Sequence, residues 1–153
     1  MKYILLLFIS FCFIACGKDS DPDTTSENTQ QLTSAEWKYD NGGIGNANGI
    51  ILIDFSTLTI IPVCMFDNSV RFHADGNGIM AENGNVCTGA PATSNFTWNL
   101  SSDGKTLNLS SAVIAGIGGS FKVKEISPTK LTLLKDTTFP IYGAGTAVVN
   151  FKH

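Results

Sequence analysis

The sequence predicts an all-β protein, an up-and-down antiparallel β-barrel of about eight strands that follows an N-terminal signal peptide and a flexible tether. From Trp37 onward, apolar and polar residues alternate in short runs, as expected of strands with one buried face. Turn residues separate the runs, and no amphipathic helix is evident between them. A meander of short strands leaves unpaired edges unless the sheet closes on itself, which favours a barrel.

The individual strands are predicted from this alternation. Phe96, Trp98 and Leu100 face one way, while Thr97 and Asn99 face the other. The same pattern recurs around five further pairs of apolar residues: Val70 and Phe72, Leu107 and Leu109, Phe121 and Val123, Leu131 and Leu133, and Val149 and Phe151. We expect each apolar set to face the core of the domain.

Short turns are predicted where the alternation stops. The turn sequences are Asp75-Gly76, Ser102-Asp103-Gly104 and Ser127-Pro128-Thr129. Their residue types favour tight connections between antiparallel strands. Ile126 does not fit the alternation of apolar and polar residues set by Val123 and its neighbours. We therefore expect a β-bulge or a strand end beside it.

Two segments do not follow the alternation. Residues 41–63 combine a loop rich in glycine and asparagine with a very apolar stretch, 50–63. This predicts a hairpin, two short strands, or a loop packed over the mouth of the barrel. Residues 111–119 are apolar and rich in glycine, and their sequence does not decide between strand and loop.

The N-terminus has the features of an export signal. One lysine precedes an apolar run over residues 3–15, which has the length of a signal-peptide core and is too short to span a bilayer. Phe13-Ile14-Ala15-Cys16-Gly17 resembles the bacterial lipobox, whose cysteine is lipidated and becomes the mature N-terminus. We therefore expect residues 1–15 to be a lipoprotein signal peptide and Cys16 to carry the lipid. The alternative is an ordinary cleaved signal peptide.

The cysteine count predicts one disulfide. Cleavage before Cys16 removes Cys12, and lipidation uses Cys16, so Cys64 and Cys87 remain. Two remaining cysteines in an exported domain imply a disulfide between them. Such a bond would stabilise the fold by roughly 3 kcal/mol in the chain-entropy description. The alternative is a pair of buried free thiols.

Residues 16–32 are predicted to be the lipidated cysteine and a disordered tether, and residues 33–153 the folded domain. The tether is polar and acidic, so it buries too little to offset the entropy of ordering it. Its start, Lys18-Asp19-Ser20-Asp21, resembles the acidic surface-export signal of Bacteroidota lipoproteins; the alternative is a solvated linker. The expected location is the outer membrane, with the lipid-anchored domain on the periplasmic or the cell-surface face.

An ordered set of motifs runs through the domain. It comprises Trp37, Cys64, Asp67, Val70-Arg71-Phe72, Asp75-Gly76, Cys87, Thr97-Trp98-Asn99-Leu100, Asp103-Gly104, Leu107, Ile126 and Leu131-Thr132-Leu133. This set resembles the small lipocalin-like domains of Bacteroidota lipoproteins over residues 33–153. The resemblance implies an eight-stranded up-and-down barrel and implies little about activity. The apolar segment at 50–63 is longer than the family pattern leads us to expect, so the mouth of the barrel departs from it.

The sequence contains no recognisable catalytic constellation. It lacks the G-x-S-x-G nucleophile elbow, and its histidines, His73 and His153, are predicted at surface and terminal positions. These histidines and the cysteines have no metal-ligand spacing. The net charge is -3 and there is no Lys/Arg run, which argues against nucleic acid as a partner. We therefore expect no enzyme activity, no cofactor and no metal site.

Two classes of function remain. The first is a binding module whose barrel or mouth holds a small apolar molecule or a glycan. Four aromatic residues are the candidate contacts inside the barrel: Phe72, Phe96, Trp98 and Phe121. In an eight-stranded barrel such residues either fill the core or line a cavity for one small ligand. The second class is a structural, accessory or inhibitory protein-interaction domain that uses the apolar segments as a protein-facing patch.

Overall fold

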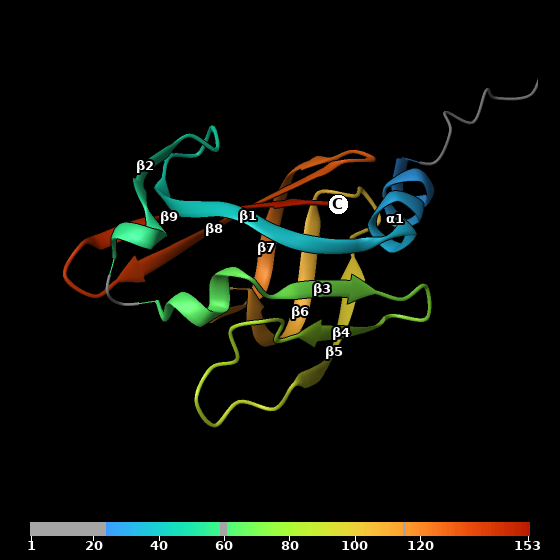
Figure 1. The fold of residues 1–153 in the computed structure, drawn as a ribbon. Helices are drawn as coiled ribbons and strands as arrows, with labels where there is room; N and C mark the ends of the chain where they lie inside the picture. Colours follow the sequence, from blue (N-terminus) through green and yellow to red (C-terminus); the bar gives the residue numbers. More distant parts are fainter. Residues whose placement is uncertain (1–23, 59–60, 115) are drawn as a thin grey trace, which may run out of the picture.

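The computed structural model describes residues 24–58, 61–114 and 116–153, and these form a closed β-barrel (Figure 1). The predicted signal peptide, the lipidation site Cys16 and the export-like sequence at 18–21 lie outside the described residues. In the part of the chain that is described, no helix has the length and hydrophobicity needed to cross a bilayer.

Eight antiparallel strands close the barrel, which confirms the predicted fold class. Closure occurs where the last strand pairs with the first, with Lys38 opposite Lys152 and Gly45 opposite Thr146. The barrel strands are β1 (Glu36–Gly45), β3 (Ser69–Phe72), β4 (Asn77–Ala81), β5 (Thr93–Leu100), β6 (Thr106–Ile114), β7 (Ile117–Ile126), β8 (Lys130–Phe139) and β9 (Gly143–Lys152).

Strand β1 shares one edge between two partners. Its first three residues pair with β3, and its last three pair with the short strand β2 (Ile51–Asp54). Strands β2 and β3 therefore follow one another along β1, separated by an excursion that contains two 3-10 helices, η1 (Phe55–Thr57) and η2 (Val63–Phe66). The described residues of this excursion, 55–58 and 61–66, are called the mouth insertion below.

Both segments that broke the alternation contribute to the sheet. Within residues 41–63, residues 41–45 belong to β1 and residues 51–54 form β2, while 55–58 and 61–63 belong to the mouth insertion. At Gly43 an added Cβ atom would lie 2.2 Å from the carbonyl oxygen of Ile53, so β2 approaches too closely for any other residue. Residues 111–114 belong to β6 and residues 117–119 to β7, and Ile114 pairs with Ile117.

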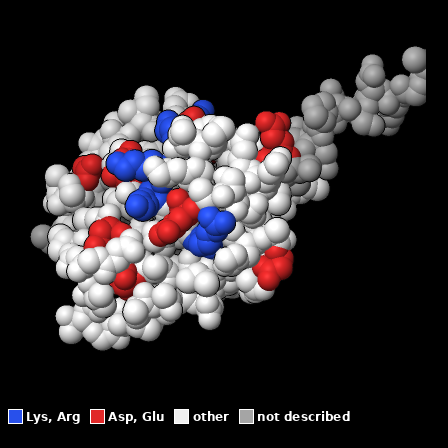
Figure 2. Space-filling model, turned by 45° about the vertical axis from the view of Figure 1, so that its right-hand side comes forward, with Lys and Arg blue, Asp and Glu red and all other residues white. Residues whose placement is uncertain are grey.

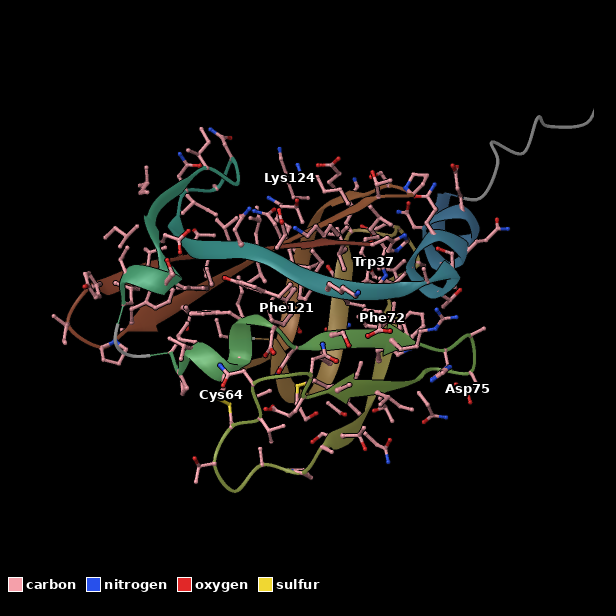
Figure 3. The ribbon with its side chains drawn as sticks, in the orientation of Figure 1. Trp37, Cys64, Phe72, Asp75, Phe121 and Lys124 are labelled. Atoms are coloured by element: carbon pink, nitrogen blue, oxygen red, sulfur yellow. A yellow bond between two sulfur atoms is a disulfide. The ribbon has the colours of Figure 1, made fainter. Side chains whose placement is uncertain are left out.

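The apolar residues of the alternating runs point into the barrel, as predicted. In Figure 3, Trp37, Phe72 and Phe121 point inward, whereas Lys124 and Asp75 lie on the outside. These three aromatic side chains are at most 1% exposed. Burial on one face and solvent on the other is the physical origin of the alternation.

The predicted bulge and turns are also present. The pairing of β7 with β8 shifts register between Val123 and Glu125, directly before Ile126. The three turn sequences lie in the connections between β3 and β4, between β5 and β6, and between β7 and β8.

The expectation of a disordered tether up to residue 32, with no helix, is wrong in its second half. Helix α1 (Thr24–Ser34) packs on one end of the barrel, called the helix end below (Figure 1). Leu32 is fully buried, and Trp37 Nε1 donates a hydrogen bond of 2.9 Å to its carbonyl oxygen. Because this helix buries so little else, it has no amphipathic signature, and tertiary packing holds it. Residues 24–32 are therefore an ordered part of the structure and not a disordered tether.

The predicted disulfide joins Cys64 and Cys87. It connects η2 to the loop between β4 and β5, away from α1 (Figures 1 and 3). Beside it, the buried carboxylate of Glu82 accepts hydrogen bonds from Asn68 Nδ2 and from the backbone N–H of Cys87, each 2.9 Å long. The mouth insertion is thereby fastened to the barrel at its C-terminal end.

Candidate functional site

The four aromatic residues predicted as ligand contacts all belong to the hydrophobic core inside the barrel. Phe72, Phe96, Trp98 and Phe121 are all buried. The ring of Phe72 makes edge-on contacts with Phe96 at 5.6 Å and with Trp98 at 5.4 Å. An added Cβ atom on Gly78 would lie 2.2 Å from the ring of Phe96. Of the two arrangements predicted for these residues, a filled core or a ligand cavity, the structure has the filled core. The side chains of this layer leave no room for a ligand.

The end of the barrel opposite the helix end is called the mouth, and the mouth insertion lies across it. The ring of Phe55 is 6.1 Å from that of Phe139 on β8, and Phe66 stacks on Tyr39 of β1 at 5.3 Å. Met65 Sδ lies 3.8 Å from the position of a Cβ atom added to the glycine of the β6–β7 turn. The insertion thus contacts three sides of the opening, which was one of the alternatives predicted for this segment.

An apolar cleft of about 240 Å³ remains beside the insertion. Its lining combines apolar side chains with two hydroxyl groups: Ile61, Gly116, Ile117, Thr137, Thr138, Phe139 and Pro140. The volume equals that of about eight water molecules in the liquid. A concave, mostly apolar site with a few polar groups is the usual form of a small-molecule site.

The turn between β8 and β9 projects next to this cleft. The side chain of Ile141 is 93% exposed, and the neighbouring Tyr142 is 47% exposed. Ile141 has a φ of 76°, a left-handed conformation that a β-branched residue adopts at a cost of about 1–2 kcal/mol. Glycine or asparagine would form this turn with less strain. A strained, exposed apolar residue suggests a role other than stabilising the folded chain.

The mouth combines charge-free segments with a few charged groups, among them Asp54 and the part-buried Lys135, whose Nζ lies 5.3 Å from the ring of Phe121. Five stretches that reach the mouth contain no Lys, Arg, Asp or Glu: 41–53, 55–66, 83–102, 106–121 and 137–151. Among the described residues, seven large hydrophobic side chains are exposed, and six belong to these stretches: Ile50, Leu52, Val63, Val86, Ile141 and Tyr142. In contrast, Figure 2 shows basic and acidic side chains interspersed on the face that it presents.

Tyr39 is the titratable group beneath the mouth insertion. Burial, and to a smaller degree the charges of Asp54 and Asp40, raises the pKa of its hydroxyl well above the ordinary value of 10. The hydroxyl therefore stays protonated and neutral over the physiological pH range. It adds no charge to the mouth.

A second cleft, of about 340 Å³, lies on the outer face of the barrel under the β1–β2 loop. Lys122, Asp136 and two hydroxyl residues surround a buried floor, Leu134. Asp136 already accepts a hydrogen bond of 2.8 Å from Thr146 Oγ1. Such polar walls suit a hydrophilic ligand, whereas an apolar ligand fits the mouth.

Neither histidine lies at the mouth. His73 is exposed beside β3, and the ring of His153 lies 3.8 Å from that of Trp37 at the helix end. Within the described ranges, no three His, Cys, Asp or Glu side chains come close enough together to hold a metal ion. No protein-family model and no curated protein matches the sequence.

Sequence reasoning identified one side of the mouth and missed the other. The apolar stretch at 50–63 was recognised as a candidate cover for the barrel. The sequence pattern does not indicate the cleft wall at 137–140 or the exposed Ile141, because alternation within a strand carries no information about the turn that follows it. Two signals could have found them: a proline followed by isoleucine at a turn, and the absence of charge from 137 to 151.

Proposed function

We propose that this chain is a membrane-anchored, non-catalytic binding protein whose barrel holds a small apolar molecule in the cleft at its mouth. The observation that carries the proposal is the cleft itself, an apolar hollow bounded by Ile61, Ile117 and Phe139. The aromatic layer below is filled by its own side chains. A ligand therefore fits at the mouth without displacing the core.

The ligand expected from this chemistry is uncharged and mostly apolar, with one polar end. The described lining has no ionisable side chain, so a charged group would lose its hydration without gaining a partner. The hydroxyl groups of Thr137 and Thr138 can each donate and accept hydrogen bonds. They would orient a carbonyl or hydroxyl group at the edge of the cleft.

The anchor in this proposal is a lipid on Cys16, which holds the domain at the outer membrane, on its periplasmic or its cell-surface face. The lipobox-like sequence supports it. Helix α1 begins at Thr24, so the link from Cys16 spans at most about 28 Å. A link of this length keeps the helix end within about 28 Å of the membrane.

Native mass spectrometry of the full chain, extracted from membranes in a mild detergent, tests the binding proposal. We expect the wild-type protein to carry a small additional mass. Ile117→Asn should weaken its retention about tenfold, since the burial of one such side chain is worth about that factor. The matched control is Ile79→Asn, which changes an exposed isoleucine of β4 outside the cleft. A wild-type protein without bound mass, or a mass that Ile117→Asn leaves in place, would refute the proposal.

Metabolic labelling with a clickable fatty acid tests the anchor. The wild-type protein and Cys12→Ala should incorporate the label, whereas Cys16→Ala should not. Label that persists in Cys16→Ala would show that the lipid is attached elsewhere.

A structural, accessory or inhibitory protein-interaction role is the second candidate. The exposed side chains of Ile141 and Tyr142, which are neighbours in the β8–β9 turn, favour it, because contiguous exposed apolar surface often marks an interaction site. Crosslinking in cells that repeatedly recovers one other protein would support this role over ligand binding.

A further inference from the structure

We propose that Asp67, Asn68 and Ser69 supply oxygen ligands to a calcium ion at the point where β3 begins and β4 ends. This inference goes beyond the proposed function. It assigns a different kind of ligand to a different part of the chain, and it does not depend on the apolar cleft.

Three consecutive residues each carry a buried oxygen atom without a hydrogen-bond partner. The atoms are Asp67 Oδ1, Asn68 Oδ1 and Ser69 Oγ. Ser69 is 1% exposed and Asn68 is 7% exposed, so bulk water does not reach them. Across the described residues, the one other buried side-chain atom of this kind is Gln31 Oε1 in α1. Since buried polar atoms in proteins are nearly always satisfied, three in one run indicate that the run binds something polar or positively charged.

The backbone at Asp67 allows neighbouring side chains to converge. Successive residues of an extended strand point to opposite faces. Asp67 ends the 3-10 helix η2 with a φ of −106° and a ψ of 1°, so it is not extended. The alternation of β3 therefore does not place the side chains of Asp67 and Asn68 on opposite faces.

A second carboxylate, that of Glu82, lies in the same corner of the barrel. Glu82 directly follows the residue of β4 that pairs with Ser69, and it is buried. One of its oxygens accepts the hydrogen bond from the backbone N–H of Cys87, and Asp67 Oδ2 accepts one of 2.8 Å from the backbone N–H of Asn85. Both carboxylates are thus bonded to the loop between β4 and β5, residues 82–92.

The charge of these carboxylates favours a cation over a water molecule. Within the part of the chain that the structure describes, no lysine or arginine forms an ion pair with Asp67 or Glu82. Their hydrogen bonds come from neutral amide groups. A water molecule would satisfy the oxygen atoms and leave the negative charge uncompensated, whereas a bound cation does both.

The chemistry of the ligands selects calcium among the cations. All the candidate ligands are carboxylate, amide or hydroxyl oxygens, the set that Ca²⁺ binds in a flexible geometry. Mg²⁺ requires a regular octahedron and gives up its water reluctantly. The nearby Cys64 and Cys87 are joined in the disulfide and provide no thiolate for a softer metal. Because the set has only two carboxylates, it is not one of the groups of three His, Cys, Asp or Glu considered above.

A calcium ion at this position would help to fasten the mouth insertion. Asp67 directly follows η2, and the disulfide joins η2 to the same loop that both carboxylates contact. The ion and the disulfide therefore hold one segment from two points. Removal of calcium should increase hydrogen exchange in η2 and leave that of α1 unchanged.

Calorimetric titration of the full chain with calcium chloride, in mild detergent and after treatment with EGTA, tests the proposal. We expect a dissociation constant between about 10⁻⁴ and about 10⁻³ M, the range of extracellular calcium modules. Asp67→Asn keeps an acceptor for the backbone N–H of Asn85 and removes the charge, so it should weaken binding at least about tenfold. The matched control, Asp103→Asn, removes an exposed aspartate at the helix end and should leave the dissociation constant unchanged. Magnesium chloride should bind at least about tenfold more weakly than calcium.

Urea unfolding distinguishes a ligand from a merely structural residue. In EGTA, Ser69→Ala should unfold at a higher urea concentration than the wild-type protein, because it removes a buried hydroxyl that has no partner. Calcium should raise the midpoint of the wild-type protein and raise that of Ser69→Ala less. An equal rise in the two proteins would show that Ser69 is not a ligand.

The outcomes separate this proposal from the one for the apolar cleft. A wild-type chain that binds no calcium, or Asp67→Asn that binds it as tightly, overturns the calcium site and leaves a buried water as its occupant. Equal affinity for magnesium overturns the choice of calcium. A small apolar mass that stays bound in EGTA and depends on Ile117 supports the ligand proposal whether or not calcium binds.

Discussion

The two ends of this barrel are closed in different ways. At the helix end, the chain completes its own packing: Leu32 is fully buried, and the indole of Trp37 is hydrogen-bonded to its carbonyl oxygen. At the mouth, an insertion fastened by a disulfide leaves an apolar cleft and exposed hydrophobic side chains. The difference teaches that the chain's own packing closes one end completely, while the other end keeps the cleft in which we propose that a ligand binds.

The turns at the two ends show the same contrast. At the helix end, hydrogen bonds from the side chain and backbone N–H of Asn77 lower the pKa of Asp75. Those from Ser101 and from the backbone N–H of Lys105 lower the pKa of Asp103. These turns are satisfied locally. The β8–β9 turn at the mouth instead holds an exposed isoleucine in a strained conformation.

The largest effect is expected at the helix end. Trp37→Ala should lower the free energy of unfolding by about 3–5 kcal/mol, because it empties a fully buried site and removes the bond to α1. Urea unfolding of the mature protein measures this. The control at the mouth, Tyr142→Ala, should change the unfolding free energy by less than about 0.5 kcal/mol. Equal losses at the two ends would remove the contrast.

Removal of the disulfide is the next largest change. The double variant Cys64→Ser and Cys87→Ser should lose about 3 kcal/mol of stability, since the bond closes a loop of some two dozen residues. Hydrogen exchange should rise in the mouth insertion while α1 keeps its protection. Increased exchange in α1 as well would show that the two ends unfold as one unit.

A smaller effect of opposite sign is expected at the β8–β9 turn. Ile141→Asn should raise the free energy of unfolding by about 1 kcal/mol, because asparagine adopts the left-handed conformation with less strain. Urea unfolding of the monomeric protein provides the measurement. A loss of stability would mean that the isoleucine contributes to its own fold after all.

The smallest effect is a pH dependence at the mouth. The folded-state pKa of Tyr39 is raised above its unfolded value of 10. Its contribution to stability is therefore fully present below about pH 10 and is lost as the pH rises beyond it. When the pH is raised from about 9 to about 11, the urea concentration at the unfolding midpoint should decrease in the wild-type protein. It should decrease less in Tyr39→Phe. Equal falls in the two proteins would assign the alkaline sensitivity to other groups.

The barrel could be predicted from the sequence because one face of each strand is buried in the core and the other is exposed to water. Phe96, Trp98 and Phe121 alternate with polar residues, and the structure buries all three. Helix α1 could not be predicted in this way. Only Leu32 among its described side chains is fully buried, so the signal for this helix is a single contact with Trp37 and not a periodicity.

The candidate site was harder to predict, because it is assembled from the ends of elements. The cleft takes Ile61 from an insertion, Ile117 from the first residue of a strand and Pro140 from a turn. Alternation within a strand carries no information about which loops meet at one end of a barrel. The disulfide was predictable because it required only a count of the cysteines.

The shared edge of β1 has a consequence for how this protein can change. Strands β2 and β3 follow one another along β1, and the barrel closes through the pairing of β1 with β9. The residues between β2 and β3 are therefore not needed to close the sheet. That interval can change in length without breaking the pairing that closes the barrel, as long as Phe55, Leu58 and Ile61 still reach the core. The length of the segment at the mouth and the closure of the barrel are therefore set by different parts of the chain.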